Sequence, residues 1–389
     1  MNLDSTKDIT LLIPTKNRTL FLKRVLLYYK KINFLGTLAI GDSSTGDFLI
    51  ENKKIYESMK DSINIIYQFL PDKGVCQANH ELLKSVKTEF VAEVHDDNFI
   101  VPGSIEQCIT YLNNNSDYSA ARGLGISVKT QNDEPYGELT KCVRKKQPSS
   151  NSDTACSRLM SLYGDYSDIH YAVHRTEIYR EVLKNSNIKD NNFFHIMTTA
   201  NTFILGKVKE LDTLHVVRHI QSPAGRKVFT DSQPESQNTY MWITGKEWSK
   251  NLEILQNSIV KNLLKMDDIS PEEAQKIYEL SFFMYFSMYL YQTGGIKGFE
   301  YFYKKYYALT LFPRWNSINE SKIFIAILFF YSHINFVLAK LKLIIFSSEV
   351  LQNETLNHRT NSLLPSLLNP KSKYHESFMP IYKLITSIK

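Results

Sequence analysis

Apolar and polar positions alternate in a regular order over the first 130 residues of the chain. Short apolar runs end at turn signals such as Pro14, Gly41 and Pro71, as is typical of buried strands. Helix-like stretches separate them. The expected strands are Ile9–Ile13, Leu35–Ile40, Ile63–Phe69 and Phe90–Val94, and the expected helices are Leu20–Lys31 and about Val75–Val86. This order predicts an α/β fold with a Rossmann-like, mostly parallel sheet flanked by helices.

The middle of the chain is less regular. Residues 131–170 are polar, and the stretches QNDEPYG and KKQPSSNSD carry the signals of loops. Helical and strand-like patterns return from Tyr171 to about Val217. The polar segment TDSQPESQN that follows indicates a linker or a mobile loop at about 229–240. We therefore expect one domain over 1–228, with halves of about 1–130 and 131–228.

The last part of the chain, 241–389, has the pattern of an α-helical domain. One helix start is clear, because Ser270 and Glu273 form the sequence of a capping box and Pro271 stands at the first helical position. Further on, Ile323–Ala339 has 17 uncharged residues flanked by lysines. A membrane-spanning helix needs roughly 20 apolar residues. The segment is therefore expected to be a buried helix or, over 323–346, a helix lying on an anionic membrane surface.

Composition narrows the function classes. The 46 basic and 40 acidic residues give a net charge of +6 that is spread along the chain. This indicates a mild preference for anionic partners rather than a nucleic-acid binder. The four cysteines form no Cys-x-x-Cys pair and suggest neither zinc nor disulfides. The polar N-terminal stretch lacks the apolar core of a secretory signal, so we expect a cytoplasmic protein.

Two nucleotide-binding motifs fail on inspection. The stretch GDSSTGDF has the glycine spacing of a phosphate loop, but Asp47 and Phe48 replace the required Lys and Ser or Thr. The stretch GLG at 123–125 lacks the third glycine of a dinucleotide fingerprint. Neither motif supports a nucleotide site.

Acidic residues at successive strand ends are the stronger signal. Asp42 follows the second expected strand, and Asp96 and Asp97 follow the fourth. Ligands of open α/β sheets bind outside the carboxyl ends of the strands, where Thr15 also lies. A nucleotide-sugar site needs a carboxylate for base or ribose and one or two carboxylates for Mg²⁺ or Mn²⁺. Each acid alone could equally be a turn residue, since Asp favours turns.

The stretches LLIPTKNR, IGDSST and DKGVCQANHELLKSVKTEFVAEVHDDNFIVPGSIE resemble the donor half of a GT-A-type glycosyltransferase of inverting family 2. The resemblance covers about 8–220, and it makes 1–130 a donor half and 131–228 an acceptor half. It implies an inverting enzyme that uses a nucleotide-sugar donor. The expected donor-binding residues are Pro14, Thr15, Asn17, Arg18, Asp42, Ser43, Lys73, Gly74, Asn79, Asp96, Arg218, His219, Arg226 and Lys227.

The chain departs from the family pattern at two points. Counting back from Pro102, Asp97 falls on the second acid of the Asp-x-Asp motif and His95 on the first. His suits Mn²⁺ better than Mg²⁺. The expected metal ligands are therefore Asp97 with Asp96 or His95, and metal-independent binding stays open. Asn79-His80 stand where the family often has Arg-Asn.

The acceptor half offers a general base. The stretch FFHIMTTANTFILGKVKEL resembles the family's Glu-Asp helix, with Phe194 and His195 in the Glu-Asp positions. An inverting transfer needs a base within reach of the acceptor hydroxyl, and His is suited to this near neutral pH. His195 is the first candidate, and Asp165 and Asp168 are the alternatives. A His beside two Phe residues is also often packed in a core.

A basic stretch, VVRHIQSPAGRKVF, holds the last four of the donor-binding residues named above. Such a loop could close over a diphosphate and offset the charge of the leaving group. It could equally be a solvated basic hairpin, because surfaces are rich in Lys and Arg.

These observations together predict a cytoplasmic glycosyltransferase, at the inner face of the cytoplasmic membrane if 323–346 binds lipid. The expected acceptor is a hydroxyl of a cell-surface glycan or a lipid-linked envelope molecule. Two alternatives stay open. One is a binding or scaffold subunit of a polysaccharide assembly complex that keeps the fold without the chemistry. The other is a sugar nucleotidyltransferase, which PTKNRTL disfavours because it has no glycine.

Overall fold

The computed structural model describes residues 4–145, 149–184, 188, 190–221, 242–243, 245–306 and 363–387. In this part of the chain a nine-stranded sheet has the order β3-β2-β1-β4-β8-β6-β9-β5, with β7 paired to β6. The strands are β1 Ile9–Thr15, β2 Thr37–Asp42, β3 Ile65–Phe69, β4 Phe90–Glu93, β5 Phe99–Ile100, β6 Tyr118–Thr130, β7 Leu139–Lys145, β8 Val173–Arg175 and β9 Lys207–His219.

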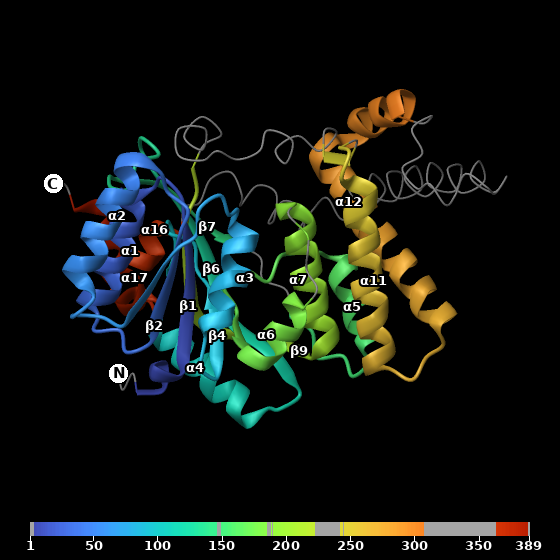
Figure 1. The fold of residues 1–389 in the computed structure, drawn as a ribbon, viewed down its shortest axis with the longest axis horizontal. Helices are drawn as coiled ribbons and strands as arrows, with labels where there is room; N and C mark the ends of the chain where they lie inside the picture. Colours follow the sequence, from blue (N-terminus) through green and yellow to red (C-terminus); the bar gives the residue numbers. More distant parts are fainter. Residues whose placement is uncertain are drawn as a thin grey trace.

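Helices cover both faces of this sheet (Figure 1). A short 3₁₀ helix, Asp4–Asp8, precedes β1. The α-helices are α1 Thr19–Lys31, α2 Gly46–Met59, α3 Val75–Ser85, α4 Pro102–Asn114, α5 Ala155–Gly164, α6 Thr176–Leu183, α7 Asn191–Leu205, α11 Trp248–Met266, α12 Pro271–Tyr306, α16 Leu364–Leu368 and α17 His375–Thr386. The predicted α/β fold, a sheet flanked by helices with a helical C-terminal region, is confirmed.

Parallel pairing is concentrated at one side of the sheet. β1 pairs in parallel with β2 and β4, and β2 with β3, as expected for strands joined by crossover helices. β6 and β9 are also parallel, whereas β4–β8, β6–β8, β6–β7 and β5–β9 are antiparallel. The prediction of a mostly parallel sheet therefore holds for β1–β4 but not for the whole sheet.

Alternation along the strands divides the core in two. Ile9, Leu11 and Ile13 of β1 join one cluster with α1, α4 and α17, and Leu12 joins a second cluster with α3, α5, α6, α7, α11 and α12. Successive side chains of a strand point to opposite faces, so a buried strand serves both clusters. We call these two faces of the sheet the α1 side and the α7 side.

The described C-terminal helices lie on different faces. α11 and α12 pack on α5 and α7, to the right in Figure 1, where Phe193 of α7 contacts the Trp248 ring at a centroid distance of 4.8 Å. α17 instead packs on α1 and β9, and the Gly137 amide donates to the Ile385 carbonyl at 2.8 Å. The boundary of a separate helical domain at 241 stays a prediction, and the expected linker at 229–240 lies outside the described residues.

The expected elements of the first 94 residues are all present, and the capping box is confirmed. The Ser270 amide donates to Glu273 Oε2 at 2.9 Å, and the Glu273 amide donates to Ser270 Oγ at 3.2 Å. The expectation of irregular structure throughout 131–170 is wrong, because β7 and α5 lie there. None of the helices in the described part of the chain is long and apolar enough to cross a membrane, and 323–346 lies outside that part.

Candidate active site

The loops after β1 and β2 meet at the carboxyl edge of the sheet. Thr15 lies opposite Asp42 in the parallel register. The Asn17 amide donates to Ser44 Oγ at 2.8 Å, and Asn17 Oδ1 accepts from the Thr45 amide at 3.0 Å. Asn17 has a φ of 54°, a left-handed conformation that Asn tolerates better than most residues. Asn17 thus holds the two loops together.

Asp42 is fully buried and stabilises the loop after β2. Its Oδ1 accepts from the Ser44 amide at 2.8 Å, and its Oδ2 accepts from Asn52 Nδ2 at 3.0 Å and from the Tyr67 hydroxyl. The neighbouring Ser43 hydroxyl donates to the Leu70 carbonyl at 2.8 Å. This is the behaviour of a turn residue. Recognition of base or ribose by Asp42 stays a prediction.

The two acids after β4 are buried and paired with one guanidinium. Arg18 Nη2 donates to Asp97 Oδ2 at 2.7 Å, and Arg18 Nη1 lies 3.1 Å from Asp96 Oδ1. The Thr15 hydroxyl donates to Asp96 Oδ2 at 2.7 Å. We call Thr15, Arg18, Asp96 and Asp97 the arginine–aspartate cluster. Asp96 and Asp97 do form a turn, but they are only 2% and 8% exposed, so the turn is not solvated.

The pairing separates the pKa values of the two acids. Burial raises the pKa of Asp96 to about 6 in spite of Arg18. Burial acts on Asp97 in the same direction, but Arg18 and His95 overcome it and lower the pKa of Asp97 to about 2. Asp97 is therefore the carboxylate that stays ionised throughout the physiological range.

A second arginine closes the α1 side. Arg24 is fully buried; its Nη2 donates to the Asp97 carbonyl at 2.8 Å, and its Nη1 lies 3.0 Å from His219 Nδ1. His219 Nε2 lies 3.1 Å from the Thr130 hydroxyl. Both ring nitrogens of His219 are thus occupied inside the protein. This does not favour the expected role of His219 in donor binding.

The expected metal ligands fit a metal ion poorly. Asp97 Oδ1 and His95 Nε2 are buried and have no hydrogen-bond partner among the described residues, so two ligand atoms are available. The other oxygen of Asp97 and both oxygens of Asp96 are engaged by Arg18 and Thr15. Within the described ranges, no group of three or more His, Cys, Asp or Glu could hold a metal ion.

Three histidines gather on the other side of the β4 end. The His170 and His195 rings are 3.9 Å apart and perpendicular, and the His95 and His170 rings are 6.1 Å apart. His170 Nδ1 lies 3.7 Å from Glu93 Oε2, and His170 Nε2 lies 4.0 Å from Asp168 Oδ1. We call Glu93, His95, Asp168, His170 and His195 the histidine cluster. It brings the expected base His195 next to a residue that the sequence did not indicate, His170.

The surroundings of the histidine cluster favour the neutral form of its imidazoles. Burial lowers the pKa of His95 and of His170 to about 4, and it lowers the pKa of His195 well below the ordinary value. His195 Nδ1 is buried and finds no partner within the described part of the chain. A neutral imidazole with an unpaired nitrogen can accept a hydrogen bond from a bound hydroxyl. Its lowered pKa makes His195 a weak base, and Glu93 and Asp168 act against this because they raise the pKa of His195.

Asp168, an alternative base, is committed to other groups. Its two oxygens accept from Lys145 Nζ at 2.8 and 2.9 Å. Burial opposes ionisation of Asp168, but His170 and Lys145 outweigh it and lower its pKa far below the ordinary value, so Asp168 is a weak base. Asp165 is exposed and is the C-cap residue of α5.

Arg218 lies between the two clusters. Its guanidinium lies 5.7 Å from the centre of the Tyr171 ring, and the Tyr171 hydroxyl lies 3.5 Å from His95 Nδ1. The pKa of Arg218 is raised by Tyr171, which has the largest effect, and by Asp168 and Asp97. The expected residues Arg226 and Lys227 lie outside the described residues.

The expected residues of α3 lie at the same edge, since this helix begins directly after β3. Gly74 is the N-cap of α3 and is exposed, and Lys73 is half-buried. Asn79 is fully buried, and neither its Oδ1 nor its Nδ2 finds a partner in the described structure. An unpaired buried amide is costly unless another group completes it.

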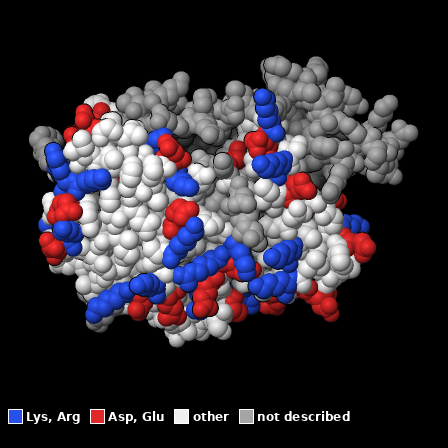
Figure 2. Space-filling model, viewed as in Figure 1, with Lys and Arg blue, Asp and Glu red and all other residues white. Residues whose placement is uncertain are grey.

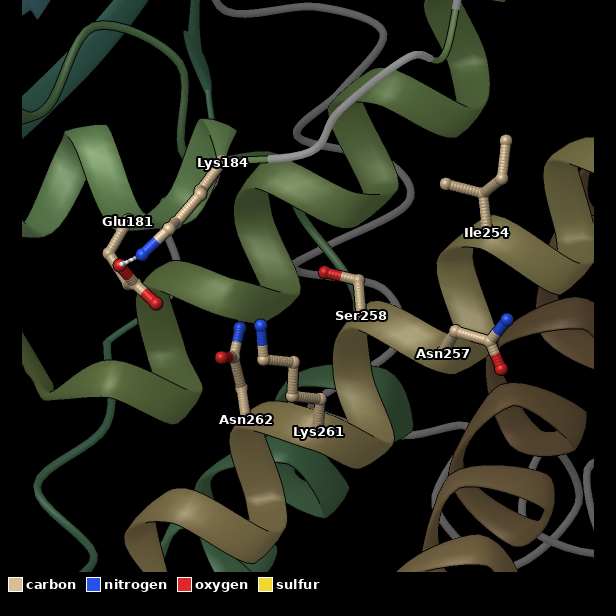
Figure 3. A pocket seen from close by; sticks show the side chains of 7 residues that line it. All are labelled: Glu181, Lys184, Ile254, Asn257, Ser258, Lys261 and Asn262. Atoms are coloured by element: carbon tan, nitrogen blue, oxygen red, sulfur yellow. Dashed lines mark hydrogen bonds and ion pairs between the residues drawn. The ribbon is translucent and has the colours of Figure 1, made fainter.

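A cavity elsewhere does not coincide with this edge. It has a volume of about 250 Å³ and is lined by Glu181, Lys184, Ile254, Asn257, Ser258, Lys261 and Asn262 (Figure 3). These residues belong to the end of α6 and to α11. β8, which leads into α6, ends at Arg175 opposite Phe90, the first residue of β4. The cavity therefore lies toward the opposite end of β4 from Asp97.

On the molecular face that Figure 2 shows, Lys and Arg side chains lie among Asp and Glu side chains.

No protein-family model matches the chain, and no curated protein matches it. Among solved structures, S. aureus TarS has 14% identity and a TM-score of 0.45 over 72% of this chain and 44% of that chain. TarS 1-349 in complex with UDP-GlcNAc has 14% identity and a TM-score of 0.46, covering 72% of this chain and 73% of that chain. The match thus covers less than half the length of the first TarS chain. A likeness at this level assigns no activity.

Proposed function

We propose that this protein is an inverting glycosyltransferase. It would move a sugar from a nucleotide-sugar donor to a hydroxyl of a cell-surface glycan or lipid-linked envelope acceptor, on the cytoplasmic side of the membrane. The observation that carries the proposal is the position of His95. His95 follows β4 between Glu93 and Asp97, so it joins the arginine–aspartate cluster to the His170–His195 pair. One sheet edge thus offers charged groups and a base side by side.

In the proposed reaction, the acceptor oxygen attacks the anomeric carbon as the bond from that carbon to the diphosphate oxygen breaks. The diphosphate leaves with the bonding electron pair. The acceptor proton passes to His195, whose Nδ1 is unpaired within the described residues. His170 would act as a positioning residue, because Glu93 and Asp168 lie within 4.0 Å of its ring and stabilise positive charge on the imidazole pair.

Arg218 is the side chain best suited to receive the leaving diphosphate. It is half-buried, and its Nε has no partner in the described part of the chain. Arginine binds phosphate oxygens through two parallel hydrogen bonds. A fixed cation at this place would stabilise the charge that develops on the leaving group.

A thermal-shift screen tests this function. UDP-, GDP-, CMP- and dTDP-sugars are added to the full chain, to Arg218→Ala and to Lys209→Ala. A ligand at about 100 times its dissociation constant stabilises the folded state by roughly 2.7 kcal/mol. We expect one nucleotide class to raise the Tm of the wild type and of Lys209→Ala, but not the Tm of Arg218→Ala. Lys209→Ala is the control, because Lys209 is a basic residue nearer the start of the same strand. No shift with any donor would contradict the proposal.

A scaffold subunit without chemistry is the second candidate. It is favoured by Asp42 and Asp96, whose carboxylate oxygens are all occupied by groups of the protein itself. The screen separates the two functions, because a scaffold subunit would give no donor shift and would instead bind a partner protein.

A further inference from the structure

Arg18 lies where a divalent cation of a nucleotide-sugar site would be expected. Its two terminal nitrogens reach the two acids after β4, at 2.7 Å from Asp97 Oδ2 and at 3.1 Å from Asp96 Oδ1. A single guanidinium thus bridges both carboxylates. Charge-assisted hydrogen bonds of this kind are among the strong ones.

The local sequence holds Arg18 in this place. Arg18 is the N-cap residue of α1, directly after the loop that Asn17 ties to the neighbouring loop. Its guanidinium lies 4.5 Å from the centre of the Phe21 ring, and its side chain is 11% exposed. A buried side chain with three contacts of this kind would lose all of them on swinging out to solvent.

The two acids already have an excess of positively charged neighbours. Arg24 donates to the Asp97 carbonyl, and Arg218 lies close enough to Asp97 for that carboxylate to raise the pKa of Arg218. Two carboxylates therefore face three guanidinium groups. A divalent cation between the acids would lie beside these guanidinium groups, and repulsion between like charges is strong in a buried site.

We infer that Arg18 takes the place of the divalent cation, so that this site binds a nucleoside diphosphate without a metal ion. Arg18 neutralises the acids, and Arg218 is left to bind the diphosphate. The choice of ligand rests on the proposed function, but the exclusion of metal does not.

The first test measures Mn²⁺ binding by electron paramagnetic resonance on the full chain without nucleotide. We expect no specific site in the wild type and one site per chain in Arg18→Ala, with affinity increased at least about tenfold. Adding Asp97→Asn to Arg18→Ala should remove that site. A wild-type site that Asp97→Asn abolishes would overturn the inference, as would the failure of a folded Arg18→Ala to gain one. If Arg18→Ala does not fold, the wild type and Asp97→Asn still decide.

The second test measures the affinity of UDP, GDP and dTDP for the wild type in excess EDTA and in Mn²⁺. Equal affinity in both buffers supports the inference, and binding that requires Mn²⁺ overturns it. If no nucleoside diphosphate binds in either buffer, the proposed function fails, while the first test still decides whether Arg18 excludes the metal.

Discussion

The two sides of the β4 end treat buried polar groups differently. On the α1 side, Arg18 and Arg24 bind the acids and the carbonyl that follow β4. On the α7 side, the ring nitrogens His95 Nε2 and His195 Nδ1 are buried without a partner in the described structure. The α1 side is therefore held mainly by ion pairs and hydrogen bonds of the protein itself, although Asp97 Oδ1, Arg18 Nε and Arg24 Nε have no partner in the described structure. On the α7 side the unpaired atoms are imidazole nitrogens.

This difference separates stability from chemistry. Removing one partner of a satisfied buried group leaves the other unpaired and destabilises the fold. Removing a group that has no partner loses no native hydrogen bond. Since proteins keep unsatisfied buried groups mainly where a ligand or a reaction uses them, the α7 side is where we expect substitutions to change activity rather than stability.

The largest expected effect is on activity. In His195→Gln the base is lost, so kcat should fall by about 10²–10⁴-fold, the usual contribution of general base catalysis. Because His195 Nδ1 has no partner among the described residues, Tm should change little. Both quantities are measured by transfer from the donor that the thermal-shift screen identifies and by thermal unfolding.

Asp165→Asn is the matched control for this prediction. It changes an exposed acid at the end of α5 that the sequence also offers as a base. Activity close to that of the wild type is expected. A loss in Asp165→Asn as large as in His195→Gln would mean that the histidine cluster is not the site of proton transfer.

The sequence predicted the first part of the fold well because its strands are continuous apolar runs. β1 and β4 are buried at every position, and both were found within two residues of their observed ends. α2 was missed because it buries only Asn52 and Met59 and so has little apolar pattern. The glycine of GLG at Gly123 is a packing residue within β6, where a Cβ would lie 2.3 Å from the Thr213 carbonyl oxygen.

Some residues of the candidate site were indicated by the sequence, and their roles stay predictions. Asp96, Asp97 and His195 could be found because they stand at strand ends or at a family position. Arg18 was expected as a donor-binding residue, but its pairing with Asp97 could not be predicted because the two residues are far apart in the sequence. His170 in YSDIHY was missed because no motif flanks it. The one available signal for His170 was the pair of acidic and aromatic residues around it, which is common in loops.

The second largest expected effect is a loss of stability, and it concerns the α1 side. Arg24→Ala leaves the Asp97 and Pro135 carbonyls and His219 Nδ1 without their donor. Removing one partner of a buried charged network costs about 3–5 kcal/mol. Urea unfolding should show this loss, against a change within about 0.5 kcal/mol for Lys30→Ala on the exposed face of the same helix. Equal stability of the two variants would show that the buried polar contacts of the α1 side do not stabilise the fold.

The smallest expected effect is on the pH dependence of the free energy of unfolding, which should differ between the α1 side and the α7 side. The pKa of His170 is lowered from 6.5 to about 4, so between these values the unfolded chain binds more protons, and stability falls as pH falls. His170→Gln should reduce this slope by about 1.4 kcal/mol per pH unit relative to the wild type.

The pKa of Asp97 is lowered from 3.8 to about 2, so its contribution is full above 3.8 and is lost as pH falls toward 2. Asp97→Asn should therefore change the pH dependence mainly below the window in which His170→Gln acts, with a smaller change inside that window because Asp97 also raises the pKa values of Asp96 and His95. Free energies of unfolding measured in urea from pH 7 to 3 would locate the two windows. Loss of the slope between pH 6.5 and 4 in Asp97→Asn, rather than in His170→Gln, would mean that the two clusters titrate as one network, and the division of the β4 end into a structural side and a chemical side would then fail.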